Sequence, residues 1–276
     1  IVFMKKSLFL ILCSCVIGVS QSATLLLHYG MGEEGSIVNG NYVDDVNHQN
    51  MPQHDGTPIT HSVTNGAPGS SSYITNTPIA WGSTITTIKN NTDSYMVSLW
   101  VNPVLTSNQA LFSLQGKLST QQSLDLKLVM TKAGTLHLSN HNVETYGSST
   151  GTDAAGTITA GNWNNIVMIY DAANSLYRFA LNGTLMDFQV SSTDKTVDWT
   201  QTTNLTMGVA PGGNFDRTDA NTGLDEFKIY GVNNGEDLAT LVQNEYANGN
   251  ANIPEPATAT LSALGLLSLL TLRRRH

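Results

Sequence analysis

The chain has little cysteine and little charge. Its only two cysteines, Cys13 and Cys15, lie close to the N-terminus. A domain that follows them has no thiol, which excludes disulfides and cysteine-ligated zinc as sources of stability. Charged residues make up only 12% of the chain. Gly, Ser, Thr and Asn are abundant instead, and this mixture favours β-strands joined by polar loops over helices.

Basic residues are especially scarce between the two ends of the chain. Five of the 13 Lys and Arg residues lie at positions 5–6 and 273–275, against one acidic residue, Glu255. The remaining sequence is strongly acidic, so it repels a phosphate backbone, and nucleic acid is excluded as a partner. Residues 24–252 match the length of one all-β sandwich, which often has roughly 200 to 250 residues.

The N-terminal segment has the three parts of a secretory signal peptide. Lys5 and Lys6 are basic, residues 7–19 are apolar, and residues 20–23 are small. We therefore assign a signal peptide to residues 4–23 and interpret residues 1–3, before Met4, as a start-site artefact. Lipidation at Cys15 is an alternative.

The C-terminal segment combines a proline motif, a short apolar run and a basic cluster. Residues 261–272 supply 12 positions, whereas a membrane span needs roughly 20. Arginines beyond such a run stay on the cytoplasmic side. In this order the parts resemble the PEP-CTERM sorting signal of Gram-negative bacteria, which implies that an exosortase processes residues 253–276 at the membrane and leaves the protein in the cell envelope, on the outer surface or in the extracellular matrix. A permanent C-terminal anchor is the alternative. The residues that carry the resemblance are Pro254, Glu255, Pro256, Arg273, Arg274 and Arg275.

The central region alternates apolar and polar residues with the period of a β-strand. Residues 95–101 place Tyr95, Val97, Leu99 and Val101 on one face. The segments 124–130 and 136–138 predict a hairpin. Further strands are expected at 163–170, 176–181 and 223–230, and Asn182-Gly183 is typical of a type I′ turn.

One helix is expected after the last strand. Leu238, Leu241 and Val242 form its apolar stripe, Asn234 is its expected N-cap, and Gly249 follows its end. We therefore assign residues 24–247 to a single domain and 248–252 to a linker.

Strands with regular turns and little helix predict a two-sheet sandwich. Four stretches then resemble, in order, the LamG-like jelly rolls of the concanavalin A-like lectin/glucanase superfamily. The resemblance implies an all-β, two-sheet antiparallel jelly-roll sandwich that binds carbohydrate, an extracellular polymer or protein. The stretches are 26–48, 97–103, 161–183 and 207–230.

No catalytic pattern stands out. The Glu-x-Asp-x-Glu string of glucanases is absent, and the adjacent Asp225 and Glu226 are expected on opposite faces of their strand. No Gly-x-Ser-x-Gly string lies between a strand and a helix pattern. The histidines at 48, 54, 61, 137 and 141 lack zinc spacing. We therefore predict a protein that is not an enzyme, with a glycoside hydrolase as a remote alternative.

A structural calcium ion is the one cofactor that the sequence suggests. Asp219, Asn221 and Asp225 place oxygen atoms at alternate positions around a glycine, and Ca²⁺ takes six or more oxygen ligands. The resemblance implies that the aspartate at 225 shares the ion with a group near the N-terminus, here Glu33. A polar loop that leads into a strand is the alternative.

Trp100 is the candidate ligand-binding aromatic. It lies on the face opposite Tyr95 and Val97, where it could stack on a sugar ring, and core packing is the alternative. Together these observations predict an exported binding protein, with a structural coat protein that has no specific ligand as the alternative.

Overall fold

The computed structural model describes twelve segments of the chain: 23–33, 35–39, 41–47, 50–51, 61–62, 66–74, 80–84, 94–117, 123–140, 144–193, 204–207 and 222–249. The expected signal peptide before Ala23 and the expected sorting tail lie outside these residues. Within these segments, no helix is long and apolar enough to cross a membrane.

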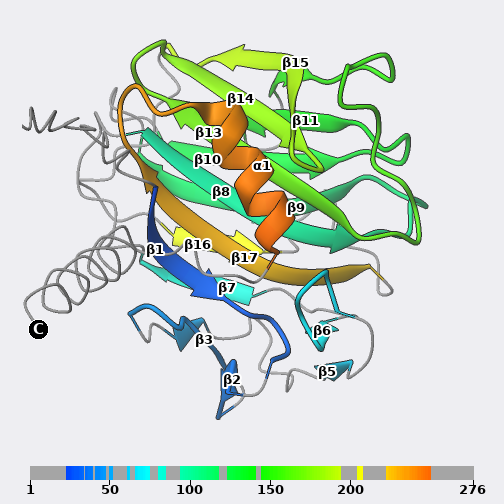
Figure 1. Ribbon diagram of the computed structural model, residues 1–276, viewed down its shortest axis with the longest axis vertical. Helices are drawn as coiled ribbons and strands as arrows, with labels where there is room; N and C mark the ends of the chain where they lie inside the picture. Colours follow the sequence, from blue (N-terminus) through cyan, green and yellow to red (C-terminus); the bar gives the residue numbers. More distant parts are fainter. Residues whose placement is uncertain are drawn as a thin grey trace, which may run out of the picture.

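Strands from both ends of the chain form an eight-stranded antiparallel sheet (Figure 1). Its order is β15-β14-β13-β8-β17-β6-β5, and β1 also pairs with β17. The first and last strands therefore lie side by side. The strands are β1 (Thr24–Tyr29), β5 (His61–Ser62), β6 (Tyr73–Ile74), β8 (Ser94–Asn102), β13 (Asn164–Asp171), β14 (Leu176–Leu181), β15 (Thr184–Ser191) and β17 (Gly223–Val232).

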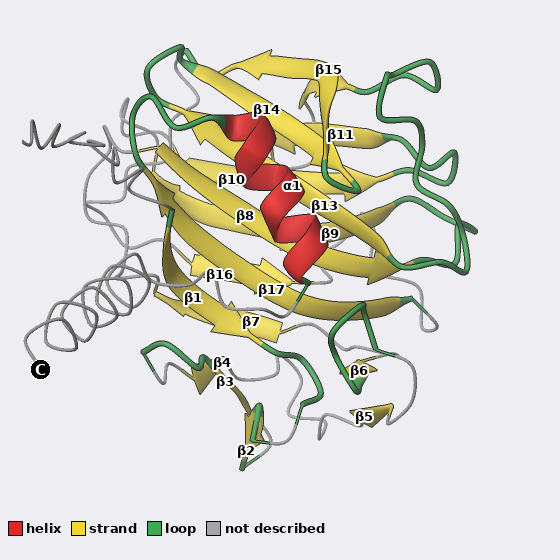
Figure 2. Ribbon diagram, in the orientation of Figure 1, coloured by secondary structure: helices red, strands yellow, loops and turns green. Residues whose placement is uncertain are grey.

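A second antiparallel sheet of six strands, in the order β12-β11-β10-β9-β16-β7, packs behind the first (Figure 2). A small sheet of β2, β3 and β4 lies beside the sandwich. The expected two-sheet jelly roll with one short C-terminal helix is thus confirmed. The strands are β2 (Ile37–Val38), β3 (Asn41–Val43), β4 (Asn50–Met51), β7 (Ala80–Thr84), β9 (Gln109–Lys117), β10 (Ser123–Met130), β11 (Leu136–Asn140), β12 (Glu144–Ser148) and β16 (Asn204–Met207).

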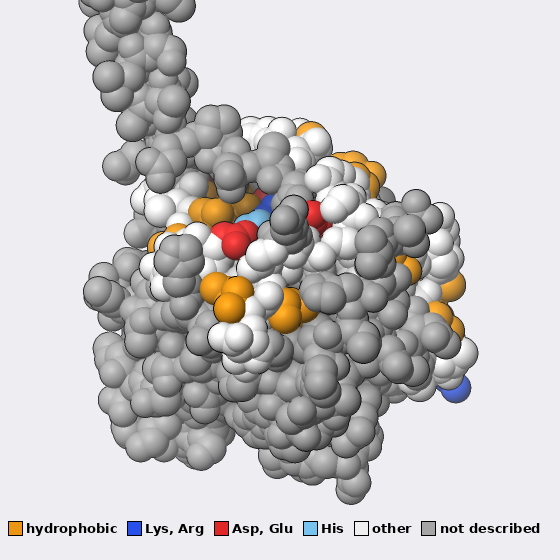
Figure 3. Space-filling view, turned by 90° about the horizontal axis from the view of Figure 1, so that it is seen from below, with side chains coloured by type: hydrophobic (Ala, Val, Ile, Leu, Met, Phe, Trp, Pro, Cys, Tyr) orange, Lys and Arg blue, Asp and Glu red, His pale blue; other side chains and the backbone are white. Residues whose placement is uncertain are grey.

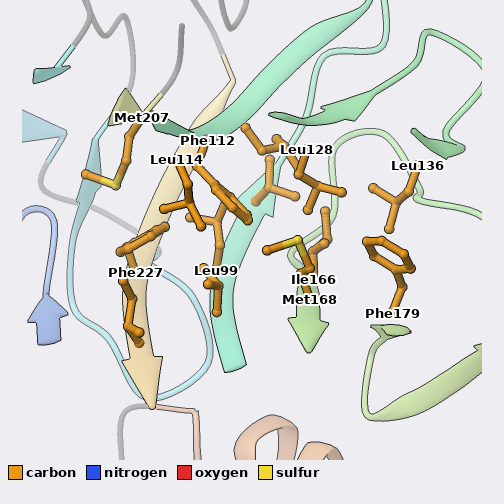
Figure 4. Close-up of a cluster of buried hydrophobic side chains, with 14 of the residues drawn as sticks. Leu99, Phe112, Leu114, Leu128, Leu136, Ile166, Met168, Phe179, Met207 and Phe227 are labelled. Atoms are coloured by element: carbon orange, nitrogen blue, oxygen red, sulfur yellow. The ribbon is translucent and has the colours of Figure 1, made fainter. Parts of the chain in front are cut away.

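The main core lies between the two large sheets, where side chains from both point toward one another (Figure 4). The alternate residues Tyr95, Val97, Leu99 and Val101 of β8 all belong to it, as their spacing predicts. The Asn182-Gly183 turn has the two positive φ angles of a type I′ hairpin, 50° and 77°.

The opposite face of the eight-stranded sheet is covered by α1 (Leu238–Asn248). Leu241 and Val242 pack there in a second apolar cluster that includes Met96 of β8. The helix begins one turn later than expected. Its N-cap is Asp237, whose carboxylate accepts the Ala239 N–H, rather than Asn234.

Candidate functional site

The most unusual backbone in the sandwich lies in β17, at Asp225 and Glu226. The register between β17 and β8 shifts between Asp225 and Lys228, and Glu226 has a φ of 51°. Leu224 and Phe227 both belong to the main core, although they lie three positions apart. An extra residue is therefore inserted as a β-bulge, and positive φ in a non-glycine residue marks local strain that often accompanies function.

The bulge places two fully buried carboxylates beside each other. Asp225 and Glu226 are each 0% exposed, and they lie between Leu224 and Phe227, which both belong to the main core. The expectation that they lie on opposite faces of a regular strand is wrong, because the bulge interrupts the alternation on which it depended.

Glu226 is held by two basic side chains. Its Oε2 lies 2.8 Å from His28 Nε2 and 3.3 Å from Lys228 Nζ. The other ring nitrogen of His28, Nδ1, lies 3.1 Å from Asp45 Oδ2. The two ring nitrogens of His28 therefore each face a carboxyl group, Glu226 in β17 and Asp45 in the loop after β3.

Lys228 connects this group to the helix on the same face. Its Nζ donates to the Gly249 carbonyl at 2.6 Å and lies 3.6 Å from Glu245 Oε1. Glu245 in turn accepts hydrogen bonds from Ser98 Oγ at 2.8 Å and Tyr230 Oη at 2.6 Å. Burial, followed by the nearby Glu245 charge, raises the pKa of the Tyr230 phenol above its usual range. The helix C-terminus is thus tied to the sheet by buried polar contacts.

A pocket of about 330 Å³ opens at the other side of Glu226. On this face of the molecule, acidic side chains surround a histidine and a basic group (Figure 3). Among the residues that the structure describes, Glu226 Oε1 has no hydrogen-bond partner although it is buried. The pocket is lined by Leu25, His28, Gly30, Glu33, Asp45, Val46 and Glu226.

Glu33 forms a second acidic wall of the pocket. Its carboxylate accepts hydrogen bonds from the Ser70 and Ser71 hydroxyls and from the Ser71 and Ser72 N–H groups, at 2.5 to 3.1 Å. Burial raises the pKa of this carboxyl, but these donors outweigh it and hold the pKa below its usual value. Glu33 is therefore ionised, and the segment Ser70 to Ser72 holds its carboxylate in place.

The loop that carries Asp45 is fixed by its neighbour. Asp44 is fully buried, and its carboxylate accepts the N–H groups of His28, Val46 and Asn47 at 2.7 to 3.1 Å. These bonds attach residues 44–47 to β1, which holds Asp45 opposite the His28 ring.

Asp225 behaves differently from the acids that line the pocket. Burial raises its pKa to about 8, although N–H donors from Ala67 and Glu226 partly oppose the shift. The side chain is therefore largely protonated at neutral pH, and Asp225 does not line the pocket.

Comparison with known proteins identifies the family. A sequence model of the concanavalin A-like lectin/glucanases superfamily matches residues 76–234, more than half of the chain. The chain belongs to this superfamily. The matched region contains the bulge with Glu226 and Lys228, whereas His28, Glu33 and Asp45 precede it. No curated protein matches the chain.

Solved structures share the superfamily fold at low identity. Domain 4 of AbnA, a GH43 extracellular arabinanase from Geobacillus stearothermophilus in complex with arabinotriose, aligns with a TM-score of 0.55 and 18% identity over 81% of this chain and 98% of that one. The sialidase of Trypanosoma rangeli in complex with sialic acid aligns with a TM-score of 0.55 and 10% identity over 82% of this chain. The chain spans only 33% of that sialidase. These identities establish the fold alone.

Two residues of the calcium prediction, Glu33 and Asp225, both accept hydrogen bonds from the segment 66–72, through Ala67 and Ser70 to Ser72. Three of the four hydrogen bonds to Glu33 reach Oε1, and one reaches Oε2. Asp219 and Asn221 lie outside the described residues. Within the described segments, no group of three His, Cys, Asp or Glu residues is arranged to hold a metal ion.

Trp100 does not form an open stacking platform. It is only 1% exposed, because its ring stacks on Tyr246 of α1 with a centroid separation of 5.5 Å. Packing, the alternative for this residue, is what the structure shows. The helix covers the face on which a sugar would have to lie.

One Gly-x-Ser-x-Gly string lies in the described part of the chain. Gly147, Ser149 and Gly151 have the spacing of a nucleophile elbow, but β12 and a turn surround them rather than a strand and a helix. Ser149 is buried, and its hydroxyl accepts the Leu136 N–H at 2.9 Å. The motif is therefore structural.

The sequence did not reveal the group formed by His28, Glu226 and Lys228. The available signal was three charged residues, Asp225, Glu226 and Lys228, inside a last strand that is otherwise free of charge. Glu245 lies on the buried side of the helix. Charges at buried positions are rarely unpaired. Their partners could not be named, because His28 is almost 200 positions away.

We predict that Lys228→Met destabilises the fold by about 3 to 5 kcal/mol, because it leaves Glu226 and Glu245 buried without their cation. Urea unfolding measures this change. Arg178→Met is the matched control, because the Arg178 side chain is 32% exposed and Asp171 keeps two hydrogen bonds from Asn174 when the arginine is removed, so it should cost about 1 kcal/mol or less. Equal losses in the two variants would contradict the buried role of Lys228.

We further predict that the contribution of the Asp225 carboxyl to the free energy of unfolding falls as the pH rises. Its folded pKa of about 8 lies above the unfolded value of 3.8, so the folded protein keeps a proton that the unfolded chain releases. Its contribution is complete below about pH 4 and declines up to about pH 8, by at most about 1.4 kcal/mol per pH unit. Asp225→Asn should remove this slope from the free energy of unfolding. Parallel curves for the variant and the unchanged protein would refute the assignment.

Proposed function

We propose that the protein is an exported, non-enzymatic carbohydrate-binding module. The supporting observation is the likeness to domain 4 of AbnA, which is covered over 98% of its length and was solved with arabinotriose. That domain is a complete unit of this fold with a bound sugar. A module of the same size and architecture is suited to the same kind of ligand, although its identity is not specified by the fold.

The arrangement of the acidic groups favours binding over hydrolysis. A glycosidase needs one protonated and one ionised carboxyl on either side of the bond that it cleaves. Burial raises the pKa of Asp225 to about 8, but Asp225 does not line the pocket. The pKa of Glu33, which does line it, is lowered by its hydrogen-bond donors. Among the described residues, the one acid with a raised pKa is therefore not placed to protonate a sugar in the pocket.

Export and sorting complete the proposal. Residues 4–23 direct secretion, and an exosortase recognises residues 253–276 and removes the tail at the membrane. The protein then acts in the cell envelope or extracellular matrix of a Gram-negative bacterium, where extracellular polymer is available as its ligand. Calcium at Asp225, with Asp219 and Asn221, remains part of this proposal as a structural ion.

Glycan binding is tested with the full chain on an array of oligosaccharides, in buffer with Ca²⁺ and in buffer with a chelator. We expect reproducible binding with dissociation constants between about 1 μM and 1 mM and no release of reducing sugar. Absence of binding to every glycan on the array would favour a coat protein without a ligand. Hydrolysis that is lost on Glu226→Gln would instead show a glycosidase.

Sorting is tested by the mass of the C-terminal peptide of the protein isolated from its own cells. We expect the peptide to end before Arg273, since processing removes the tail. A native protein that retains Arg273, Arg274 and Arg275 would support a permanent anchor and contradict processing.

A further inference from the structure

The pocket beside Glu226 contains an acceptor that none of the described residues satisfies. Glu226 is 0% exposed, yet its Oε1 lacks a hydrogen-bond partner among the described residues. A buried oxygen of this kind is costly to leave unpaired, and it gains most from a donor supplied by a ligand. Its other oxygen is fixed by His28 and Lys228, so the free oxygen has a defined position.

Gly30, which lines the same pocket, borders this oxygen. The position that a Cβ on Gly30 would occupy lies 3.8 Å from Glu226 Oε1 and 3.6 Å from Glu33 Cγ. Because Gly30 has no side chain, two carboxylate-bearing walls flank an open space. The volume of about 330 Å³ is at the small end of ligand sites, which range from about 300 to 1,000 Å³. It suits one sugar residue better than a long segment of chain.

The charges around the pocket select the ligand. Three acidic side chains, those of Glu33, Asp45 and Glu226, line it together with the ring of His28. Lys228 lies behind Glu226 and is shared with Glu245. An anionic group entering the pocket would meet like charges, whereas a hydroxyl or ammonium group would meet acceptors.

A metal ion does not fit the same atoms. Both nitrogens of His28 already face carboxylates, and Glu33 accepts four hydrogen bonds. Within the described segments, no three His, Cys, Asp or Glu residues are arranged to hold a metal ion. The pocket therefore matches an organic hydrogen-bond donor.

We propose that this pocket binds a neutral or amine-bearing sugar residue, whose O–H or N–H group donates to Glu226 Oε1, and that it rejects acidic sugars. The inference rests on the glycan-binding function proposed above and assigns that function a place and a specificity. Leu25 and Val46 supply apolar contacts for the sugar ring. The binding face is thus the edge where β1 meets β17, and not the helix-covered face of Trp100.

The first test is the pattern of binding on an array that includes neutral, amine-bearing, uronic, sialylated and sulfated glycans. We expect the neutral or amine-bearing members to bind, and their carboxylated or sulfated counterparts to bind at least about tenfold more weakly. Comparing glucose, glucosamine and glucuronic acid oligomers of equal length separates the hydroxyl from the ammonium as donor. Preference for the acidic members would overturn the proposal.

The second test blocks the pocket without removing a charge. Gly30→Ala adds a methyl group at ordinary contact distance beside Glu226 Oε1, and Gly30→Val fills more of the space. Gly30 does not have a positive φ, so neither change strains the backbone. We expect the affinity for the best ligand of the array to fall progressively, by about tenfold or more for Gly30→Val.

Gly151→Ala is the matched control, because its Cβ would meet only Thr157 Cγ2 at 4.0 Å. It should leave affinity unchanged, and all three variants should keep the thermal midpoint of the unchanged protein. Should Gly30→Val unfold, Gly30→Ala carries the test. Full affinity in the Gly30 variants would refute this pocket while leaving glycan binding intact. Failure of the unchanged protein to bind any glycan would refute the proposed function itself.

Discussion

The structure depends on the buried carboxylate of Glu226, which lies between His28 of the first strand and Lys228 of the last. A charge at this depth is tolerated only with close opposite charges. Glu226 thereby joins β1 to β17, and Lys228 extends the link to Glu245 and the Gly249 carbonyl at the end of the helix. Glu226 and Lys228 thus connect the first strand, the last strand and the C-terminal end of the helix.

This constraint also explains the form of the pocket. The bulge at Asp225 and Glu226 turns a strand that should alternate into one that presents two acids away from the core. Burial raises the pKa of Asp225 to about 8, whereas Glu226 has partners among the described residues on Oε2 alone. Its Oε1 lies beside Gly30 at the wall of the pocket. The strained backbone and the paired carboxylate therefore have a common origin in two residues of β17.

The sequence was sufficient for features that depend on local patterns. Alternation predicted the strands around Tyr95 to Val101, and Asn182-Gly183 predicted its turn, because both follow from neighbouring residues. Features that depend on distant partners were not predictable. The bulge leaves no local signal in the sequence beyond an Asp-Glu pair. Trp100 is buried by a helix that begins almost 140 positions later. That helix has Asp237 as its N-cap, although Asn234 is an equally good capping residue. The expectation of opposite faces for Asp225 and Glu226, and the stacking role considered for Trp100, both depended on the local pattern and ignored distant residues that pack against them.

The central claim is that the unpaired oxygen of Glu226 receives a ligand. The most direct measurement is a crystal structure of the protein with the tightest-binding neutral or amine-bearing oligosaccharide. We predict a sugar residue in the pocket with an oxygen or nitrogen atom 2.6 to 3.2 Å from Glu226 Oε1, as expected for a hydrogen bond. An oligosaccharide bound elsewhere, with Glu226 Oε1 still unpartnered, would contradict the account.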